Sequence, residues 1–449
     1  MTRSGGYRQV CALSVPIAGV QLAGVALTTT DVAVLQTLGV VVIAGGGLAM
    51  QLYNQIRTMC VGMVTACSNL VAEATAAPQI RQRVRASFAV GTATAVGGGG
   101  VLMALAGLVF ALPVDREVAW VCLAVAGALA PGLVPMMWMN VLRQTAVGMG
   151  RPGSLVVVTV ASIVVNGALD VGFVALAPTP LWGAVGVGCA TSCVQAVTVA
   201  AYVAMVRRDA TVAPVVQVWP RPGDAPMIRQ VVRLGIPVSL TYGSEAALTT
   251  VAAVTMGALS PELLAAHTVV NQIAYVVYQV CIGFSHGGSV LVSTALRQGR
   301  AAVAGVSRRV LVCVVVYLTV MGVAWVLAGR WVVGVFLAGA DAHTVHSAAM
   351  LLYFAVAQQY AKGLGNVLVG LLRGVRDTVS GLRATTVGYW VVGVPALVVL
   401  GVPVGWGGYG VWAGLVAGFA TTAGLLARTY RRRISALPET GLGSEGRLG

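Results

Sequence analysis

The stretch that decides the fold is VLVCVVVYLTVMGVAWVLAG, residues 310–329, which contains no Asp, Glu, Lys or Arg. A bilayer has a hydrocarbon core of about 30 Å, and an apolar helix of about 20 residues crosses it. Similar uncharged stretches occur at residues 118–142, 171–206, 263–296 and 384–427. We therefore expect membrane-spanning helices, because the strands of a membrane barrel alternate in polarity over about ten residues.

The composition of the whole chain agrees with this expectation. Of the 449 residues, 58% are hydrophobic and only 9% are charged. A soluble domain carries roughly 25% charged residues. This excludes a cytosolic enzyme, a disordered chain and a secreted disulfide scaffold.

Breaks rich in proline and glycine, such as Pro178-Thr179-Pro180, divide the longer apolar stretches into single spans. The sequence thus predicts an all-α integral membrane protein with twelve transmembrane helices. The expected spans are residues 10–35, 39–68, 87–111, 118–142, 154–176, 181–206, 231–258, 264–296, 309–328, 345–372, 384–403 and 407–428.

Arginine placement predicts the orientation of these spans. The chain has 28 basic and 13 acidic residues, a formal net charge of +15. With the N-terminus inside, the outer loops carry only Arg116 and Arg330, as the positive-inside rule requires. We therefore expect a multi-pass protein of a prokaryotic inner membrane with both termini cytoplasmic, no nucleic-acid partner and no cleaved signal peptide.

Two halves of the chain share short motifs in the same order. Leu13-Ser14-Val15-Pro16 parallels Leu234-Gly235-Ile236-Pro237, and Asn54-Gln55-Ile56 parallels Asn271-Gln272-Ile273. Parallel repeats of six spans are typical of transporters with a central cavity. We expect an N-lobe at 1–206, a cytoplasmic loop at 207–230, a C-lobe at 231–430 and a cytoplasmic tail at 431–449.

Acids inside the spans are rare and indicate function, because burying a charge in lipid is costly. Asp31 and Asp170 are two of them, and Asn166 lies one helical turn before Asp170. Two such carboxylates hold a proton or, with amide and hydroxyl oxygens, an alkali cation such as Na⁺. The alternative is that they only pair with polar backbone or with Arg57.

A second set of polar residues falls at the expected cavity. Glu245 is a candidate for binding a cationic substrate or a second proton, or else is neutralised by Arg57 or Lys362. Lys362, the only lysine, is either a cavity residue or a side chain that snorkels to the membrane edge. The repeated polar pairs complete the expected cavity lining, namely Asn54, Gln55, Asn271 and Gln272.

Several motifs together resemble the MATE (multidrug and toxic compound extrusion) transporters. The similar segments are Ser14-Val15-Pro16 followed by Asp31, Asn166 to Asp170, Ala190-Thr191, Leu234 to Pro237 followed by Glu245, Ala265-Ala266-His267, and Leu372 to Thr378. The resemblance covers residues 10–430.

The resemblance implies two six-helix lobes around a central cleft and export of organic cations in exchange for H⁺ or Na⁺. By it, Asp31, Asn166, Asp170 and Thr191 match the family's cation site in the first lobe, and Glu245 matches the acid of the second. Many members carry an Asp where this chain has Lys362. Coupling is therefore expected to depend on the first lobe.

The leading hypothesis is an antiporter that exports a small, organic, cationic substrate by alternating access. We expect it to be a monomer in contact with membrane lipid. We expect no cofactor beyond the coupling ion, H⁺ or Na⁺. The alternative is a flippase for a lipid-linked precursor, with Arg57 and Lys362 on its phosphates. An intramembrane enzyme and a passive channel are weaker alternatives. No catalytic constellation or nucleotide-binding motif is recognisable, so we expect no enzyme activity and no ATP drive.

Overall fold

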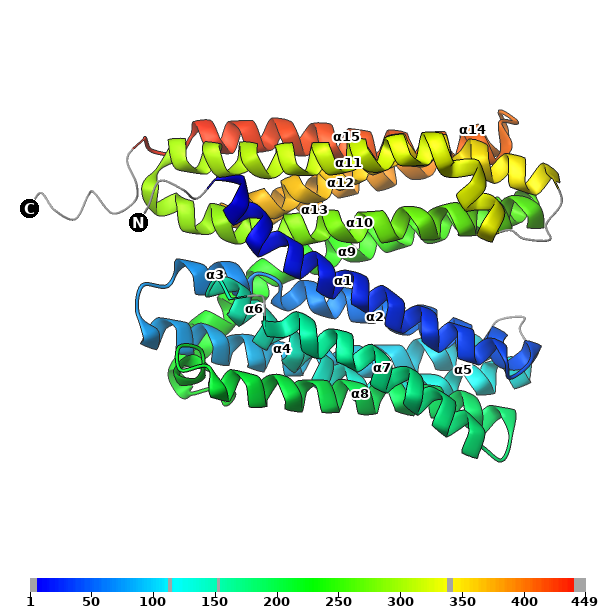
Figure 1. Ribbon diagram of the computed structural model, residues 1–449, viewed down its shortest axis with the longest axis horizontal. Helices are drawn as coiled ribbons and strands as arrows, with labels where there is room; N and C mark the ends of the chain where they lie inside the picture. The colour runs from blue at the N-terminus through cyan, green and yellow to red at the C-terminus, as the bar shows by residue number, and fades with distance from the viewer. Residues whose placement is uncertain (1–5, 112–114, 152–153, 337–341, 440–449) are drawn as a thin grey trace, which may run out of the picture. The chain divides into compact units, whose positions relative to one another are not determined.

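A computed structural model describes residues 6–111, 115–151, 154–336 and 342–439. Within these ranges every regular element is a helix (Figure 1). Each of the twelve expected spans coincides with one helix or with a run of consecutive helices. The predicted all-α fold is therefore confirmed.

The first six spans correspond to α1 (Tyr7–Gln36), α2 (Val40–Val64) with α3 (Cys67–Glu73), α4 (Ala77–Leu108) with η1 (Val109–Ala111), α5 (Arg116–Leu129) with η2 (Ala130–Gly132) and α6 (Leu133–Gly148), α7 (Ser154–Leu176), and α8 (Pro180–Arg208). The joining loop contains η3 (Ala213–Val215) and η4 (Pro222–Asp224). The last six correspond to α9 (Ala225–Leu259), α10 (Pro261–Ala295) with η5 (Leu296–Gln298), α11 (Arg300–Phe336), α12 (Ala342–Gly374), α13 (Val379–Thr385) with η6 (Thr386–Gly393) and α14 (Val394–Gly401), and α15 (Gly407–Ser435).

Local sequence signals fix several of the helix starts. The Thr179 hydroxyl accepts a hydrogen bond from the backbone N–H of Trp182, and Ser260 caps Leu263 in the same way. Proline follows both caps, at the first helical position, where no N–H is needed. The breaks that the sequence predicts at these positions are therefore turns between capped helices.

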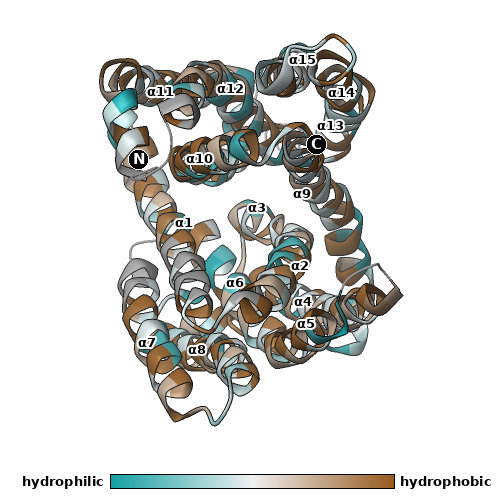
Figure 2. Ribbon diagram, turned by 90° about the vertical axis from the view of Figure 1, so that its right-hand side faces the viewer, coloured by the Kyte–Doolittle hydropathy of each residue, from teal (hydrophilic) through white to brown (hydrophobic). Residues whose placement is uncertain are grey.

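The outer surface of the helices is apolar. Eight helices in the described part of the chain are long and apolar enough to cross a membrane, by length and composition. The side chains of Val164, Leu176 and Leu327 are 72, 85 and 81% exposed. Exposure of such apolar side chains is unfavourable in water and favourable in lipid. Figure 2 shows hydrophobic residues along helices of both halves of the chain. The protein is a multi-pass membrane protein.

The chain divides into two compact units. The N-terminal unit is Gly19–Ser239, and the C-terminal unit is Met1–Ala18 with Leu240–Gly449. The start of α1, up to Ala18, thus belongs to the C-terminal unit. The start of α9, up to Ser239, belongs to the N-terminal unit. The lobe limits given above, which place each helix in one lobe, stay predictions.

Each unit has its own core. In the N-terminal unit α2 packs against α5, α4 against α6 and α7 against α8, around buried residues such as Phe88 and Met137. In the C-terminal unit α10 packs against α12 and α12 against α15, around Trp412 and Phe419.

The repeated motifs form a matching pair of close helix crossings, one in each unit. A Cβ added at Gly62 on α2 would lie 2.6 Å from the Cα of Ser239 on α9. A Cβ added at Gly283 on α10 would lie 2.7 Å from the Cα of Ala18 on α1. Ser239 and Ala18 each come two residues after the proline of the repeated motif. Only glycine allows backbones to approach this closely.

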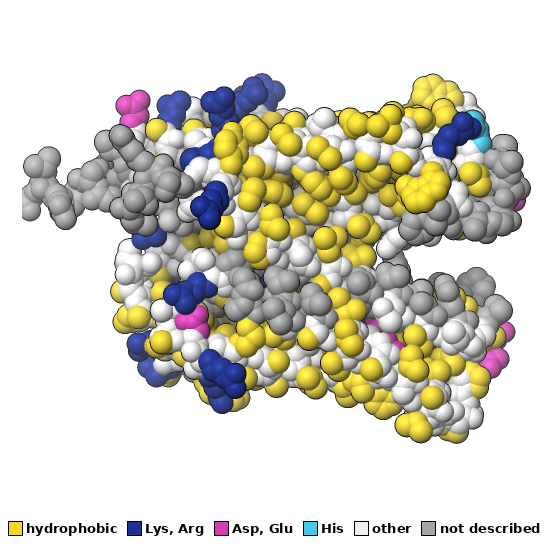
Figure 3. Space-filling view, in the orientation of Figure 1, with side chains coloured by type: hydrophobic (Ala, Val, Ile, Leu, Met, Phe, Trp, Pro, Cys, Tyr) yellow, Lys and Arg dark blue, Asp and Glu magenta, His cyan; other side chains and the backbone are white. Residues whose placement is uncertain are grey.

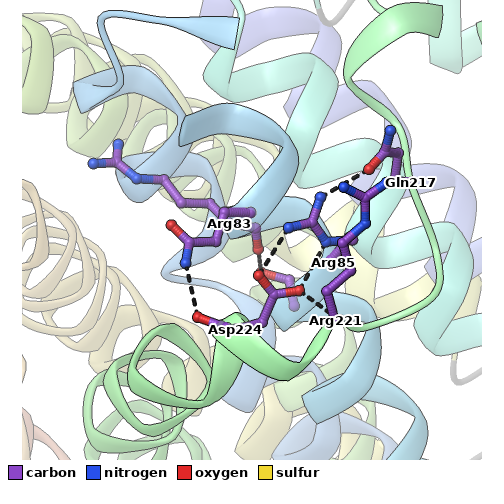
Figure 4. A network of polar contacts seen from close by, with 8 residues as sticks. Arg83, Arg85, Gln217, Arg221 and Asp224 are labelled. Atoms are coloured by element: carbon purple, nitrogen blue, oxygen red, sulfur yellow. Dashed lines mark hydrogen bonds and ion pairs between the residues drawn. The ribbon is translucent and has the colours of Figure 1, made fainter. Parts of the chain in front are cut away.

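The joining loop is held on α4 by a charged network (Figure 4). Arg85 donates to both carboxylate oxygens of Asp224, at 2.7 and 2.8 Å, and to the amide oxygen of Gln217 at 2.8 Å. Arg85 hydrogen-bonds the charged carboxylate of Asp224 and thereby stabilises it. The pKa of Asp224 is therefore lower than usual. The loop is therefore fixed to the N-terminal unit by a bidentate ion pair.

Candidate functional site

Asp31, Asn166, Asp170 and Thr191 meet in the N-terminal unit. The amide nitrogen of Asn166 donates to Asp31 Oδ1 at 2.5 Å and to Asp170 Oδ2 at 2.8 Å. The Thr191 hydroxyl donates to Asp31 Oδ2 at 3.1 Å. Side chains from α1, α7 and α8 thus form one hydrogen-bonded cluster.

Helix geometry explains part of this cluster. Asn166 and Asp170 lie one turn apart on α7, so both point to the same face. A Cβ added at Gly186 on α8 would lie 2.8 Å from the Cβ of Phe173 on α7. This glycine lets α8, which carries Thr191, approach α7 closely.

The cluster is fully enclosed, and some of its oxygens have no partner. Asp31 is 2% exposed, while Asn166 and Asp170 are 0% exposed. Among the described residues, Asp170 Oδ1 and Asn166 Oδ1 have no hydrogen-bond partner. Two buried carboxylates in contact with the same amide repel each other unless a proton or cation neutralises them. The arrangement is therefore chemically suited to bind a small cation.

Arg57 does not complete the cluster as an ion-pair partner. It lies half-buried on α2. No ion pair joins it to Asp31 or Asp170 in the part of the chain that the structure describes. Among the described residues, Arg57 therefore does not neutralise these acids by direct pairing.

Glu245 and Lys362 meet in the C-terminal unit. Lys362 Nζ on α12 lies 3.1 Å from Glu245 Oε1 on α9, with side chains 9 and 17% exposed. The Tyr278 hydroxyl donates to Glu245 Oε2 at 3.0 Å, and the Asn366 amide donates to that hydroxyl at 2.7 Å. Both oxygens of Glu245 are therefore engaged.

The Lys362 ammonium is also enclosed by aromatic rings. It lies 4.2 Å from the ring centre of Tyr278 and 5.3 Å from that of Phe419 on α15. A carboxylate and two ring faces are the surroundings that bind an ammonium ion well. Lys362 does not snorkel to a membrane edge; its own ammonium fills the cation position beside Glu245.

The remaining predicted cavity residues are less informative. Asn54 and Gln55 are half-buried on α2, in the N-terminal unit. Asn271 is half-buried and Gln272 exposed on α10, in the C-terminal unit. Their roles stay predictions.

Sequence reasoning missed Tyr278, Asn366 and Phe419 as members of the Glu245 cluster. Asn366 lies one helical turn after Lys362, and this spacing was the available signal. Tyr278 and Phe419 lie on other helices and look like ordinary core aromatics in the sequence.

Comparison with known proteins identifies the family. The sequence profile of the MatE family matches residues 237–399. A protein of Bradyrhizobium diazoefficiens named "Probable multidrug resistance protein NorM" is 33% identical over 437 residues, covering 93% of this chain and 92% of the relative. The chain belongs to the MATE family. A protein of Rhizobium meliloti with the same name is 32% identical, covering 96% of this MATE chain and 95% of the relative.

Solved MATE structures have the same fold. The eukaryotic MATE transporter AtDTX14 matches with a TM-score of 0.82 at 18% identity, covering 96% of this chain and 100% of that one. A transporter of the MOP superfamily from Pyrococcus furiosus, described as having a binding pocket of reverse polarity, matches with a TM-score of 0.79 at 17% identity. That match covers 96% of both chains. As a MATE protein, this chain is a transporter, which supports the expectation that it has no enzyme activity.

Proposed function

We propose that this MATE transporter exports organic, cationic drugs or metabolites in exchange for a monovalent cation, H⁺ or Na⁺, by alternating access. The observation that carries the proposal is the bridge of Asn166 between the buried carboxylates of Asp31 and Asp170. The relatives named as multidrug resistance proteins support the efflux of drugs.

The hydrogen-bond pattern of the cluster favours H⁺ over Na⁺. The amide N–H₂ of Asn166 and the hydroxyl of Thr191 already donate to three carboxylate oxygens. Asp170 Oδ1 is the carboxylate oxygen that has no donor in the described part of the chain. With the amide oxygen Asn166 Oδ1, the cluster offers two oxygens without a donor among the described residues. A proton needs only one such oxygen, whereas a metal cation must gather several.

Coupling follows from the position of the cluster at three helices. When the carboxylates lose their counter-charge, their repulsion loosens the contact of α1 with α7 and α8. When a cation neutralises them, the contact tightens. The cation can shift the balance between the two facing states only by binding one of them more strongly.

The C-terminal unit contributes no second free coupling site in this proposal. Glu245 already holds the Lys362 ammonium, so a soluble cation would have to displace a tethered one. This supports coupling through the N-terminal unit alone.

The decisive experiment uses proteoliposomes with a fluorescent organic cation and separately imposed proton and sodium gradients. Asp31→Asn and Asp170→Asn are expected to abolish gradient-driven efflux while the protein still inserts and elutes as a single species. Asp115→Asn, which changes an exposed loop acid, is the matched control and is expected to transport normally. Normal efflux by both cluster variants would overturn the proposal.

We also propose a prokaryotic inner-membrane location, with both termini cytoplasmic, a monomeric state and no nucleic-acid partner. The bacterial relatives support the membrane, and the arginine distribution supports the orientation. The flippase alternative has weaker support, because the Lys362 charge on which it depended is paired with Glu245.

A further inference from the structure

A groove with a volume of about 570 Å³ lies between α11 and α15 in the C-terminal unit. Its α11 side runs from Ala304 to Val316, and its α15 side is formed by Tyr430, Arg431 and Ile434. Neither the cation cluster nor the Glu245 pair contributes a residue to it. The groove is therefore separate from the proposed transport site, and an inference about it goes beyond the proposed function.

The length of the groove fits one leaflet of a bilayer. Val316 lies twelve positions after Ala304, which corresponds to roughly 18 Å along a helix that rises about 1.5 Å per residue. Half of a bilayer core is about 15 Å. Val312, Val315 and Val316 line it and are 38, 40 and 57% exposed. An open apolar groove of this length accommodates an acyl chain.

One end of the groove is positively charged. Arg308 near the start of α11 and Arg431 near the end of α15 both line it and are exposed. Figure 3 shows basic side chains gathered at the end of this unit where α11 begins and α15 ends, with apolar side chains further along. The described lining contains no Asp or Glu. The charge at this end is therefore not offset from within the groove.

The groove also has a buried, polar contact at this end. The Ser307 and Tyr430 hydroxyls are hydrogen-bonded to each other, and the two residues are 3 and 4% exposed. The Ser307 hydroxyl also donates to the backbone carbonyl of Val303 at 2.7 Å. The hydroxyl pair joins α11 to α15 at the two residues that directly precede Arg308 and Arg431 in the chain.

We propose that this groove is a binding site for an anionic phospholipid, with its phosphate headgroup at Arg308 and Arg431 and an acyl chain along Val312 to Val316. Guanidinium groups bind phosphate oxygens in a bidentate manner, and basic sites between helix ends attract anionic lipid headgroups. Two guanidinium groups repel an organic cation. A soluble phosphate would fit less well than an anionic lipid, because it leaves the apolar part of the groove unfilled. A zwitterionic lipid would also fit less well, because it brings its own positive group to the arginines.

The test is native mass spectrometry of the full chain released from nanodiscs of phosphatidylglycerol or phosphatidylcholine. We expect bound phosphatidylglycerol on the unaltered protein and roughly 10- to 30-fold weaker binding by R308Q/R431Q. R428Q/R432Q is the matched control: it removes two exposed arginines at the same helix end that do not line the groove, and is expected to retain the lipid. Equal loss in both double variants, or no loss in the first, would overturn the proposal.

Two further arms test the ligand and the apolar part of the site. Glycerol phosphate, which has the headgroup charge and no acyl chain, is expected not to compete at millimolar concentration; competition would assign the site to a free phosphate. Val312→Trp fills the groove without changing charge and is expected to lower phosphatidylglycerol binding at least tenfold. If the double variant does not elute as a single species, R308Q and R431Q alone each report the same loss at smaller size.

Discussion

The Lys362 ammonium lies 3.1 Å from the Glu245 carboxylate, inside a helical unit of a membrane protein. The two residues come from α12 and α9, and Tyr278 contacts both of them. Because the two side chains are only 9 and 17% exposed, each charge depends on the other for much of its stabilisation. The pair therefore makes Glu245 a structural anion as long as Lys362 is present.

Removing one member of this pair is expected to destabilise the C-terminal unit more than removing both. Lys362→Met leaves a nearly buried carboxylate without its cation, at a cost of about 3–5 kcal/mol. The double variant Lys362→Met/Glu245→Gln is expected to recover most of that loss. Thermal unfolding in detergent of the two single variants and the double variant gives the coupling energy. Strict additivity of the two changes would contradict a direct pair.

Thr191 is expected to affect coupling through its hydroxyl and not through its bulk. Thr191→Val keeps the shape and removes the hydrogen bond to Asp31, so we expect roughly tenfold slower gradient-driven efflux, corresponding to about 1.4 kcal/mol. Thr191→Ser keeps the hydroxyl and is expected to restore most of the rate. Uphill transport in proteoliposomes is the measurement, and equal rates for the two variants would contradict the role of the hydroxyl.

The glycines at the two matching helix crossings are expected to be sensitive to a single methyl group. At Gly62 and Gly283 an added Cβ would lie 2.6 and 2.7 Å from the Cα of another helix, so G62A and G283A should each cost about 1–3 kcal/mol. G100A is the control, because a Cβ there meets nothing within 4 Å among the described residues. In a helix that control is expected to be neutral or slightly stabilising. Melting temperatures of the three variants decide the matter.

The Arg85–Asp224 pair predicts that the joining loop detaches from α4 at low pH. The folded-state pKa of Asp224 is lower than its ordinary value of 3.8, because Arg85 hydrogen-bonds the charged carboxylate. Its stabilisation is therefore complete above about pH 5 and is lost as the pH falls through the lowered pKa. Amide exchange of residues 209–224, corrected for the intrinsic rate, should show protection at pH 5–7 and release below pH 3.

The same loop is expected to open at neutral pH when Arg85 is removed. Arg85→Ala leaves Asp224 without its bidentate partner, so cleavage within residues 209–224 by a protease should be at least tenfold faster. Arg208→Ala removes an exposed arginine close to the loop and serves as the control. Equal cleavage of the two variants would mean that other contacts hold the loop.

Much of the fold follows from local sequence. A run such as residues 310–329 cannot be placed in water, so a spanning helix is its stable form, and caps such as Thr179 and Ser260 mark where helices start. The candidate site was predictable where its members share a helix, as Asn166 and Asp170 do. Tyr278 and Phe419 were not predictable, because nothing in their own helices separates them from core aromatics.

The sequence by itself determined the spans, their order and the scarcity of embedded charge, because hydrophobicity and helical spacing are properties of neighbouring residues. Tertiary structure alone decided that Asn166 lies between Asp31 and Asp170, and that Lys362 faces Glu245 and not lipid. Those contacts depend on which helix faces pack together. Residues far apart in the chain set that packing, through close approaches such as Gly188 on α8 against Ala128 on α5.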